Sequence, residues 1–164
     1  MSASPFFSPE DVLIGYIGYL LGGDLAMGLE AGTILQKKGY PAVELSGDVF
    51  TMLDVIKSYN PKKLILVGAV RRGRAPGTVE IYRFKPQPPG RPEEVLEALR
   101  PSLEGRISLE DLLIGLSYIE RPTEDIYVVE CEPPDPSPRI GLSEEGMKCV
   151  EEVVKRVEEL YAHL

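Results

Sequence analysis

The sequence alternates short apolar runs with longer amphipathic segments, and this alternation restricts the chain to few folds. Residues 63–68 form the most apolar run, which is typical of a strand buried on both faces at the middle of a parallel sheet. Residues 12–18 form a similar run that ends at glycine. Amphipathic segments with helical spacing follow residue 24 and residue 48, and a brief strand is expected at 41–45. Strands and helices that alternate in this way predict a parallel sheet covered by helices.

Two further strands, one of them at an edge, and three further helices complete the expected fold. Residues 78–84 alternate strictly between apolar and polar side chains, which is typical of a strand that exposes one face at a sheet edge. The remaining elements are expected at 92–99 and from Ser108 (helices), at 125–129 (strand) and from Ser143 onward (helix). The pattern predicts one α/β domain over residues 1–164. Its fold class is a three-layer α/β/α sandwich with a mostly parallel five-stranded sheet and one antiparallel edge strand.

Polar residues mark the expected starts of four helices. Asp24, Asp48, Ser108 and Ser143 each precede a helical segment, and side chains of this kind accept hydrogen bonds from the free N–H groups of a first helical turn. The last helix should pack on the sheet through one apolar stripe, made of Met147, Val150, Val153, Val154, Val157, Leu160 and Tyr161.

Composition and charge exclude several classes of function. The net charge of −8 argues against nucleic acid or an anionic membrane as a partner, because phosphate binding depends on Lys and Arg. The first residues lack the basic region of a signal peptide, which predicts a cytoplasmic location. Cys131 and Cys149 form no CxxC motif, so we expect two buried free thiols and neither a disulfide framework nor a zinc site. A single Asn among many Glu, Lys and Arg is typical of thermophilic proteins.

Common catalytic and nucleotide-binding motifs are absent from the sequence. The glycines near residues 15–23 match neither GxGxxG nor GxxxxGK[ST], so tight packing at a turn explains them better than phosphate binding. There is no GxSxG and no HExxH, and the only histidine is His163. Catalysis by a Ser-His or Cys-His pair is therefore not expected.

Four short segments resemble those of one known family. Residues 18–28 resemble Gly-Asn-x-Leu-x-x-Asp-(Glu/Asp)-Gly-x-Gly, the signature of the hydrogenase maturation endopeptidases, and match it at Gly18, Leu21, Asp24 and Gly28. Residues 64–69 resemble the family's central strand, which ends in Val-Asp-Ala. Residues 76–79 match its Pro-Gly-Thr-Val, and residues 142–143 match the Leu-Ser that precedes its last helix. All four segments occur in the family's order.

The resemblance implies a fold and a partner, but no nickel site. The family binds a nickel-iron hydrogenase large-subunit precursor, senses its nickel and removes a C-terminal extension. Its metal ligands are a Glu or Asp, an Asp and a His. Leu25 and Gly68 stand at the first two of these positions, and no His lies near residues 105–109. Leu and Gly side chains supply no charge or lone pair for a divalent ion, so no cofactor is expected.

The remaining polar and aromatic residues near the loops after Gly18 and Gly68 are weak candidates for a site. Asp24 is the one candidate for catalysis, although helix capping explains both it and Asp48. Arginines at 71, 72 and 74 could hold a carboxylate or phosphate, but a solvated loop is the favoured interpretation. Tyr19 replaces the family's Asn and either packs in the core or forms an aromatic binding surface. The candidate binding set is Tyr19, Asp24, Leu25, Asp48, Gly68, Arg71 and Arg72.

Three hypotheses about function follow. The first is a homologue, or pseudoenzyme, that binds a nickel-iron hydrogenase large subunit or a related metalloprotein without nickel-dependent cleavage. The second is an active C-terminal processing peptidase in which Asp24, with Asp48 or Glu110, replaces the lost ligands. The third is an α/β module that binds a small molecule or an anion at the glycine turn and the arginines.

Overall fold

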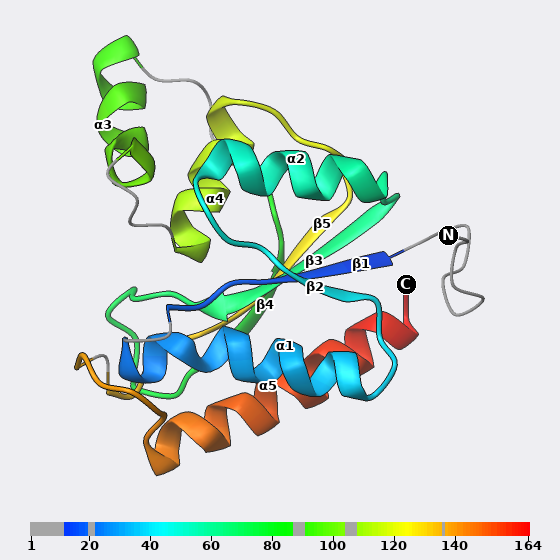
Figure 1. The fold of residues 1–164 in the computed structure, drawn as a ribbon, viewed down its shortest axis with the longest axis vertical. Coiled ribbons are helices and arrows are strands. Elements are labelled where there is room, and N and C mark those ends of the chain that lie inside the picture. Colours follow the sequence, from blue (N-terminus) through cyan, green and yellow to red (C-terminus); the bar gives the residue numbers. More distant parts are fainter. Residues whose placement is uncertain (1–11, 20–21, 87–90, 104–107, 136) are drawn as a thin grey trace.

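A parallel sheet with one antiparallel edge strand forms the centre of the molecule (Figure 1). The structure, a computed structural model, describes residues 12–19, 22–86, 91–103, 108–135 and 137–164. The described strands are β1 (Val12–Tyr16), β2 (Ala42–Glu44), β3 (Lys63–Ala69), β4 (Val79–Arg83) and β5 (Ile126–Cys131). They form a five-stranded sheet in the order β2-β1-β3-β5-β4. All neighbours are parallel except β4 and β5, which confirms the predicted fold class.

The central position of β3 follows from its composition. Residues Leu64, Ile65, Leu66 and Val67 are wholly buried, because β3 lies between β1 and β5 and is covered on both faces. A strand with that environment must be apolar on both sides. The edge strand β4 alternates between partly buried and exposed side chains, as its sequence predicts.

Helices cover both faces of the sheet (Figure 1). One face carries α1 (Met27–Lys37) and α5 (Glu144–Ala162), and the other carries α2 (Val49–Tyr59) and α4 (Leu109–Tyr118). The helix α3 (Pro92–Leu103) lies beside α4 and extends further than the predicted 92–99. Buried valines of α5 fill one core and leucines of α4 fill the other. None of the helices within the described ranges is long and apolar enough to cross a membrane.

Three of the four predicted helix caps are present, at Asp48, Ser108 and Ser143. The Asp48 carboxylate accepts a hydrogen bond from the Thr51 N–H at 2.8 Å, and the Ser143 hydroxyl accepts one from the Gly146 N–H at 2.9 Å. Asp24 is not a cap, so that prediction was wrong. A 3-10 turn, η1 (Gly23–Ala26), contains Asp24, and α1 begins after it at Met27 without a side-chain cap.

The two cysteines form a disulfide between β5 and α5. Cys131 and Cys149 are both buried, as predicted, and their Cα atoms are 6.7 Å apart. The prediction of free thiols was wrong, because the spacing along the chain does not show that α5 returns to lie over the end of β5. A cross-link that closes a loop of 18 residues is worth about 3 kcal/mol through the entropy of the unfolded chain.

The apolar stripe of α5 is shorter at its start than predicted. Val150, Val153, Val154 and Val157 are buried, whereas Met147 is 37% exposed. Met147 lies in the first turn of α5. The predicted packing of Met147 was therefore wrong.

Candidate functional site

The carboxyl ends of β1 and β3 meet the first turn of α4, and we call this region the strand-end site. Gly68, near the end of β3, faces the Ile17 carbonyl and the buried side chain of Leu109. A Cβ atom built on Gly68 would lie 3.1 Å from the Ile17 oxygen, 3.1 Å from Leu109 Cβ and 3.2 Å from Leu109 Cδ2. The space beside Gly68 is therefore occupied by an apolar side chain.

Glycines allow the turn after β1 to pack tightly, as predicted. Gly28 abuts the Ile17 carbonyl so closely that no Cβ would fit. A Cβ on Gly18 would come 2.7 Å from Leu29 Cγ. Gly23 has a φ of 60°, which strains any residue with a side chain. Gly18 and Gly28 serve packing between the end of β1 and α1, whereas Gly23 packs against the backbone of Asp135 and Ser137.

Asp24 is wholly buried and fully hydrogen-bonded. Its Oδ2 atom accepts from the Asp135 N–H at 2.8 Å and from the Ser143 hydroxyl at 2.6 Å. Its Oδ1 atom accepts from the Ser143 N–H at 2.8 Å. The carboxylate thus joins η1 to the start of α5 and to the loop that precedes it, which we call the proline-rich loop (residues 133–135 and 137–139). Gly146 of α5 leaves room for it, because a Cβ there would overlap the carboxylate.

Tyr19 and Leu25 lie on either side of Gly22. A Cβ on Gly22 would lie 2.9 Å from Tyr19 Cδ2 and 2.8 Å from Leu25 Cβ. Tyr19 is 59% exposed, so it does not pack in the core, and Leu25 is partly buried. Backbone bonds also pair Gly22 and Gly23 with Arg139 of the proline-rich loop. Tyr19 is therefore an exposed aromatic residue close to Gly22.

Asp48 lies at the surface, at the start of α2. Hydrogen bonds from Thr51 lower the pKa of its carboxyl group, as expected for a carboxylate that caps a helix. The carboxylate is therefore engaged in capping, which supports the favoured interpretation of Asp48.

Arg72 belongs to a buried ionic cluster. Its Nε atom donates to Glu130 Oε1 at 2.5 Å and its Nη2 atom donates to Glu130 Oε2 at 3.2 Å. Glu130 is 1% exposed. The Tyr82 hydroxyl donates to Glu130 Oε2 at 3.0 Å and accepts from Arg72 Nη2 at 3.2 Å. Burial, with the charge of Glu130, raises the pKa of Tyr82 to about 12, so the hydroxyl stays protonated.

Arg74 extends the cluster to two more carboxylates. Its guanidinium group donates to Glu130 at 2.9 Å, to Glu132 at 3.0 Å and to Glu80 at 2.6 Å. Burial acts to raise the pKa of Glu132, but hydrogen bonds from the Arg72 N–H and from Arg74 outweigh it, and the pKa is lowered. We call Arg72, Arg74, Glu80, Glu130 and Glu132 the arginine–glutamate network.

The network overturns the interpretation of Arg72 and Arg74 as part of a freely solvated loop. The Arg72 side chain is 39% exposed and that of Arg74 is 14% exposed, and both guanidinium groups bind carboxylates of the same chain. Arg71 is exposed. Sequence reasoning missed Glu130 and Glu132. Glu130 and Glu132 stand at the end of an otherwise apolar strand, and this pattern could have revealed them. Buried carboxylates require partners, so the pattern predicts a pairing with basic side chains nearby.

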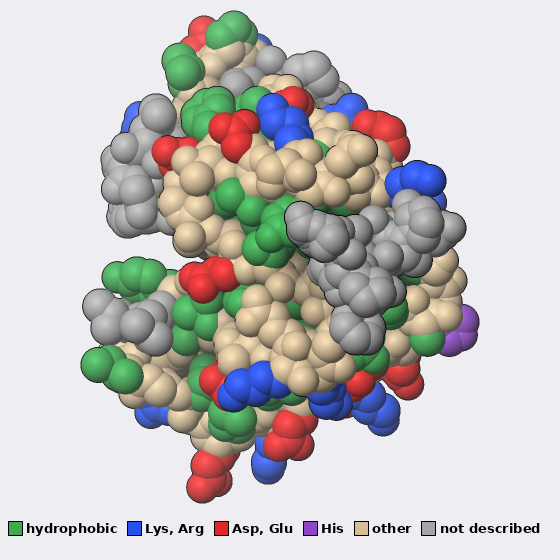
Figure 2. All heavy atoms as spheres, turned by 45° about the vertical axis from the view of Figure 1, so that its right-hand side comes forward, with side chains coloured by type: hydrophobic (Ala, Val, Ile, Leu, Met, Phe, Trp, Pro, Cys, Tyr) green, Lys and Arg blue, Asp and Glu red, His purple; other side chains and the backbone are tan. Residues whose placement is uncertain are grey.

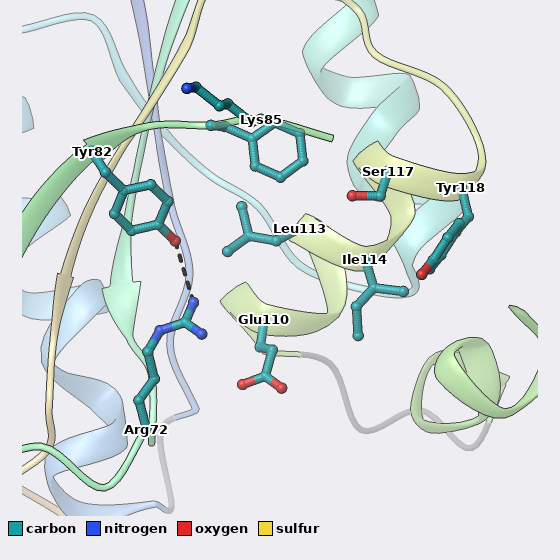
Figure 3. Close-up of a pocket in the computed structure, with 9 residues that line it drawn as sticks. Arg72, Tyr82, Lys85, Glu110, Leu113, Ile114, Ser117 and Tyr118 are labelled. Atoms are coloured by element: carbon teal, nitrogen blue, oxygen red, sulfur yellow. Dashed lines mark hydrogen bonds between the residues drawn. The ribbon is translucent and has the colours of Figure 1, made fainter. Parts of the chain in front are cut away.

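A pocket of about 380 Å³ lies between the end of β4 and α4 (Figure 3). Its walls combine apolar, aromatic and charged side chains. They are Arg72, Tyr82, Phe84, Lys85, Glu110, Leu113, Ile114, Ser117 and Tyr118. Figure 3 shows Arg72 and Glu110 facing one another at one end, while the Lys85 side chain leads away from Leu113 and Ile114. Of the candidate binding residues, only Arg72 lines this pocket.

The side chains of the described residues include no cluster of three or more His, Cys, Asp or Glu that could hold a metal ion.

On the face that Figure 2 shows, acidic and basic side chains are interspersed, and the outline is indented between the two helical layers.

Solved structures of hydrogenase maturation proteases match this chain along most of its length. The protease HybD from Thermococcus kodakarensis matches with a TM-score of 0.63 and 25% identity, over 91% of this chain and 97% of that one. A hydrogenase 2 maturation peptidase from a Thaumarchaeota archaeon matches with a TM-score of 0.59 and 22% identity, over 92% and 97%. HybD from Escherichia coli matches with a TM-score of 0.57 and 19% identity, over 89% and 88%.

No protein-family model matches the sequence, and no curated protein matches it either. The chain nevertheless has the fold of the hydrogenase maturation proteases, which confirms the structural resemblance predicted from four short segments.

Proposed function

We propose that this chain is a homologue of the hydrogenase maturation endopeptidases. In this proposal it binds a nickel-iron hydrogenase large subunit, or a related metalloprotein, in the cytoplasm and does not carry out nickel-dependent cleavage. The fold supports the choice of partner class, since HybD of Thermococcus kodakarensis is a [NiFe] hydrogenase maturation protease. The observation that carries the proposal is the apolar closure of the strand-end site by Leu109 against Gly68.

The residues at the strand-end site do not fit a nickel ion. By the resemblance, Leu25 and Gly68 stand at two ligand positions, and Leu109 stands near the third. Nickel and similar divalent ions need imidazole, carboxylate or thiolate donors, and these three residues supply only hydrocarbon. Leu109 is 1% exposed and fills the space beside Gly68.

Asp24 does not replace the missing ligands in this proposal. Both of its oxygen atoms already accept hydrogen bonds from Asp135 and Ser143. Binding a metal would break these bonds and leave buried N–H groups without partners, which costs about 1–3 kcal/mol for each group. A rearranged peptidase site built on Asp24 is therefore disfavoured.

An anion-binding site at the arginines is disfavoured for a similar reason. An external phosphate or carboxylate would have to compete with Glu130 and Glu132, which are buried beside Arg72 and Arg74. Removing one partner from a buried ion pair costs about 3–5 kcal/mol.

Exposed apolar side chains beside the strand-end site support the binding of a protein. Tyr19 is 59% exposed and Ile140 is 79% exposed. The bonds between Gly22, Gly23 and Arg139 hold the two segments that carry them side by side. Aromatic residues are enriched where proteins bind one another.

The test is to mix the purified chain with a nickel-loaded large-subunit precursor and to measure both complex formation and release of the C-terminal peptide. We expect a complex and no peptide. An active maturation protease with the same precursor is the positive control. Failure to form any complex would contradict the binding part, and released peptide would contradict the noncatalytic part.

A further inference from the structure

The pocket between β4 and α4 has the features of a site for a polypeptide segment. We propose that it binds an extended segment of the partner protein, with one apolar side chain against Phe84, Leu113 and Ile114 and a backbone amide between Arg72 and Glu110. This inference rests on the proposed function, since it names the chemistry of the partner segment. The pocket adjoins the strand-end site at the first turn of α4, but neither Gly68 nor Leu109 lines it.

Arg72 is held in place as one wall of the pocket. Glu130 binds its Nε and Nη2 atoms, and Tyr82 accepts a further bond from Nη2. A tyrosine hydroxyl is protonated at neutral pH, so Tyr82 also donates a hydrogen bond to Glu130 and helps to hold that carboxylate in place. The side chain of Arg72 is still 39% exposed. Arg72 therefore presents a fixed donor edge, with its charge balanced by Glu130 behind it.

Glu110 lies opposite Arg72 and is available to a ligand. Figure 3 shows its carboxylate facing the Arg72 guanidinium across one end of the pocket. Within the described part of the chain, no ion pair joins these two side chains and no hydrogen bond engages the Glu110 carboxylate. A group that accepts a bond from Arg72 and donates one to Glu110 would bridge them.

A neutral peptide group meets that requirement best. It has one carbonyl acceptor and one N–H donor on opposite sides. A carboxylate could accept a bond from Arg72 but could donate none to Glu110, and an ammonium group could donate to Glu110 but could accept none from Arg72. The donor and acceptor at this end of the pocket therefore favour an uncharged amide, which does both.

The rest of the pocket suits an apolar side chain in an extended segment. Phe84, Leu113 and Ile114 form its apolar wall. Its volume of about 380 Å³ falls in the range of about 300–1,000 Å³ that is typical of ligand sites. Tyr82 and Phe84 come from β4 or directly after it, and the described sheet ends at β4. An edge strand beside a side-chain pocket is a common means of binding extended peptides.

The first experiment uses N-acetyl-leucine-N-methylamide, which carries one apolar side chain between two neutral amides. Nuclear magnetic resonance of the full chain would follow the methyl signals of Leu113 and Ile114 during titration. We expect both signals to shift with a Kd in the millimolar range. The glycine analogue should bind about tenfold more weakly, because it lacks the apolar side chain. N-acetyl-leucine, which has a free carboxylate, should also bind more weakly.

The matched variants are Glu110→Gln and Glu145→Gln. Glu110 and Glu145 are both exposed and are both the second residue of a helix. Glu110→Gln should weaken binding of the leucine amide about fivefold, and Glu145→Gln should leave it unchanged. The inference is overturned if Leu113 and Ile114 do not respond to the amide, or if both variants bind it equally.

A second experiment separates this inference from the proposed function. Ile114→Asp places a charge in the apolar wall and should reduce binding of the large-subunit precursor at least tenfold. If the precursor binds the wild type and Ile114→Asp equally, the pocket inference is wrong and the proposed function stands. If the precursor binds neither, the proposed function fails, and the amide titration still decides whether the pocket binds a peptide group.

Discussion

Asp24→Asn should destabilise the chain strongly, although it changes few atoms. The carboxylate of Asp24 receives two backbone N–H groups, one on each oxygen, and the Ser143 hydroxyl. An amide offers only one oxygen, so its NH₂ group must face either the Asp135 N–H or the Ser143 N–H. One buried N–H then loses its partner, and the bonds that remain lose the assistance of the negative charge.

These two effects add up to about 3 kcal/mol. For a chain of 164 residues, that loss lowers Tm by roughly 6–12 °C. Urea unfolding followed by circular dichroism would measure the change in the free energy of unfolding. Asp48→Asn is the control, because Asp48 is an exposed cap and Asn caps helices equally well. If Asp24→Asn costs less than about 0.5 kcal/mol, the structural role of Asp24 is refuted and its carboxylate is free for chemistry.

Three further predictions concern the disulfide, Glu132 of the arginine–glutamate network and Tyr82, which bonds to that network. Cys149→Ser should lower the free energy of unfolding by about 3 kcal/mol, and reducing agent should destabilise the wild type but not the variant, as urea unfolding would show. The pKa of Glu132 is lower in the folded protein than its ordinary value of 4.5, so the charged carboxylate stabilises the fold at any pH above 4.5. This stabilisation is lost as the pH falls through the folded-state pKa. Glu132→Gln should therefore flatten the acid side of a plot of the free energy of unfolding against pH. The pKa of Tyr82 is raised to about 12, and those of Tyr16, Tyr40 and Tyr127 are also raised, so absorbance at high pH should show a late phase of tyrosine titration. Tyr82→Phe should remove the part of that phase near pH 12, and an unchanged titration would be the contrary result.

Local patterns predicted the elements well, because the forces that form them act over a few residues. The apolar run of β3 identified the centre of the sheet, and the alternation in β4 identified its edge. Asp48 and Ser143 cap helices through bonds to N–H groups three residues away, which a sequence pattern can reveal.

Contacts between distant segments could not be predicted in the same way. Asp24 bonds to residues 111 and 119 positions further along the chain, so its environment depends on where the proline-rich loop returns. Arg72 and Arg74 meet acids more than fifty positions away, at the end of β5. The pairing of Cys131 with Cys149 depends on how α5 lies over the sheet.

The candidate site at the ends of β1 and β3 stays a prediction. These strand ends lie close together, as neighbouring parallel strands require, but the sequence did not show that Leu109 of α4 closes the space beside Gly68. The pocket beside α4 was not predicted. Its walls come from Arg72, from residues 82–85 and from α4, and these segments share no sequence motif.

The central claim is that this chain keeps the fold of the maturation proteases and binds a partner without nickel-dependent cleavage. The most direct measurement is mass spectrometry of a nickel-loaded large-subunit precursor after incubation with the purified chain. The account predicts that the precursor keeps its full mass while it is in complex with the chain. A precursor shortened at its C-terminus would contradict the account.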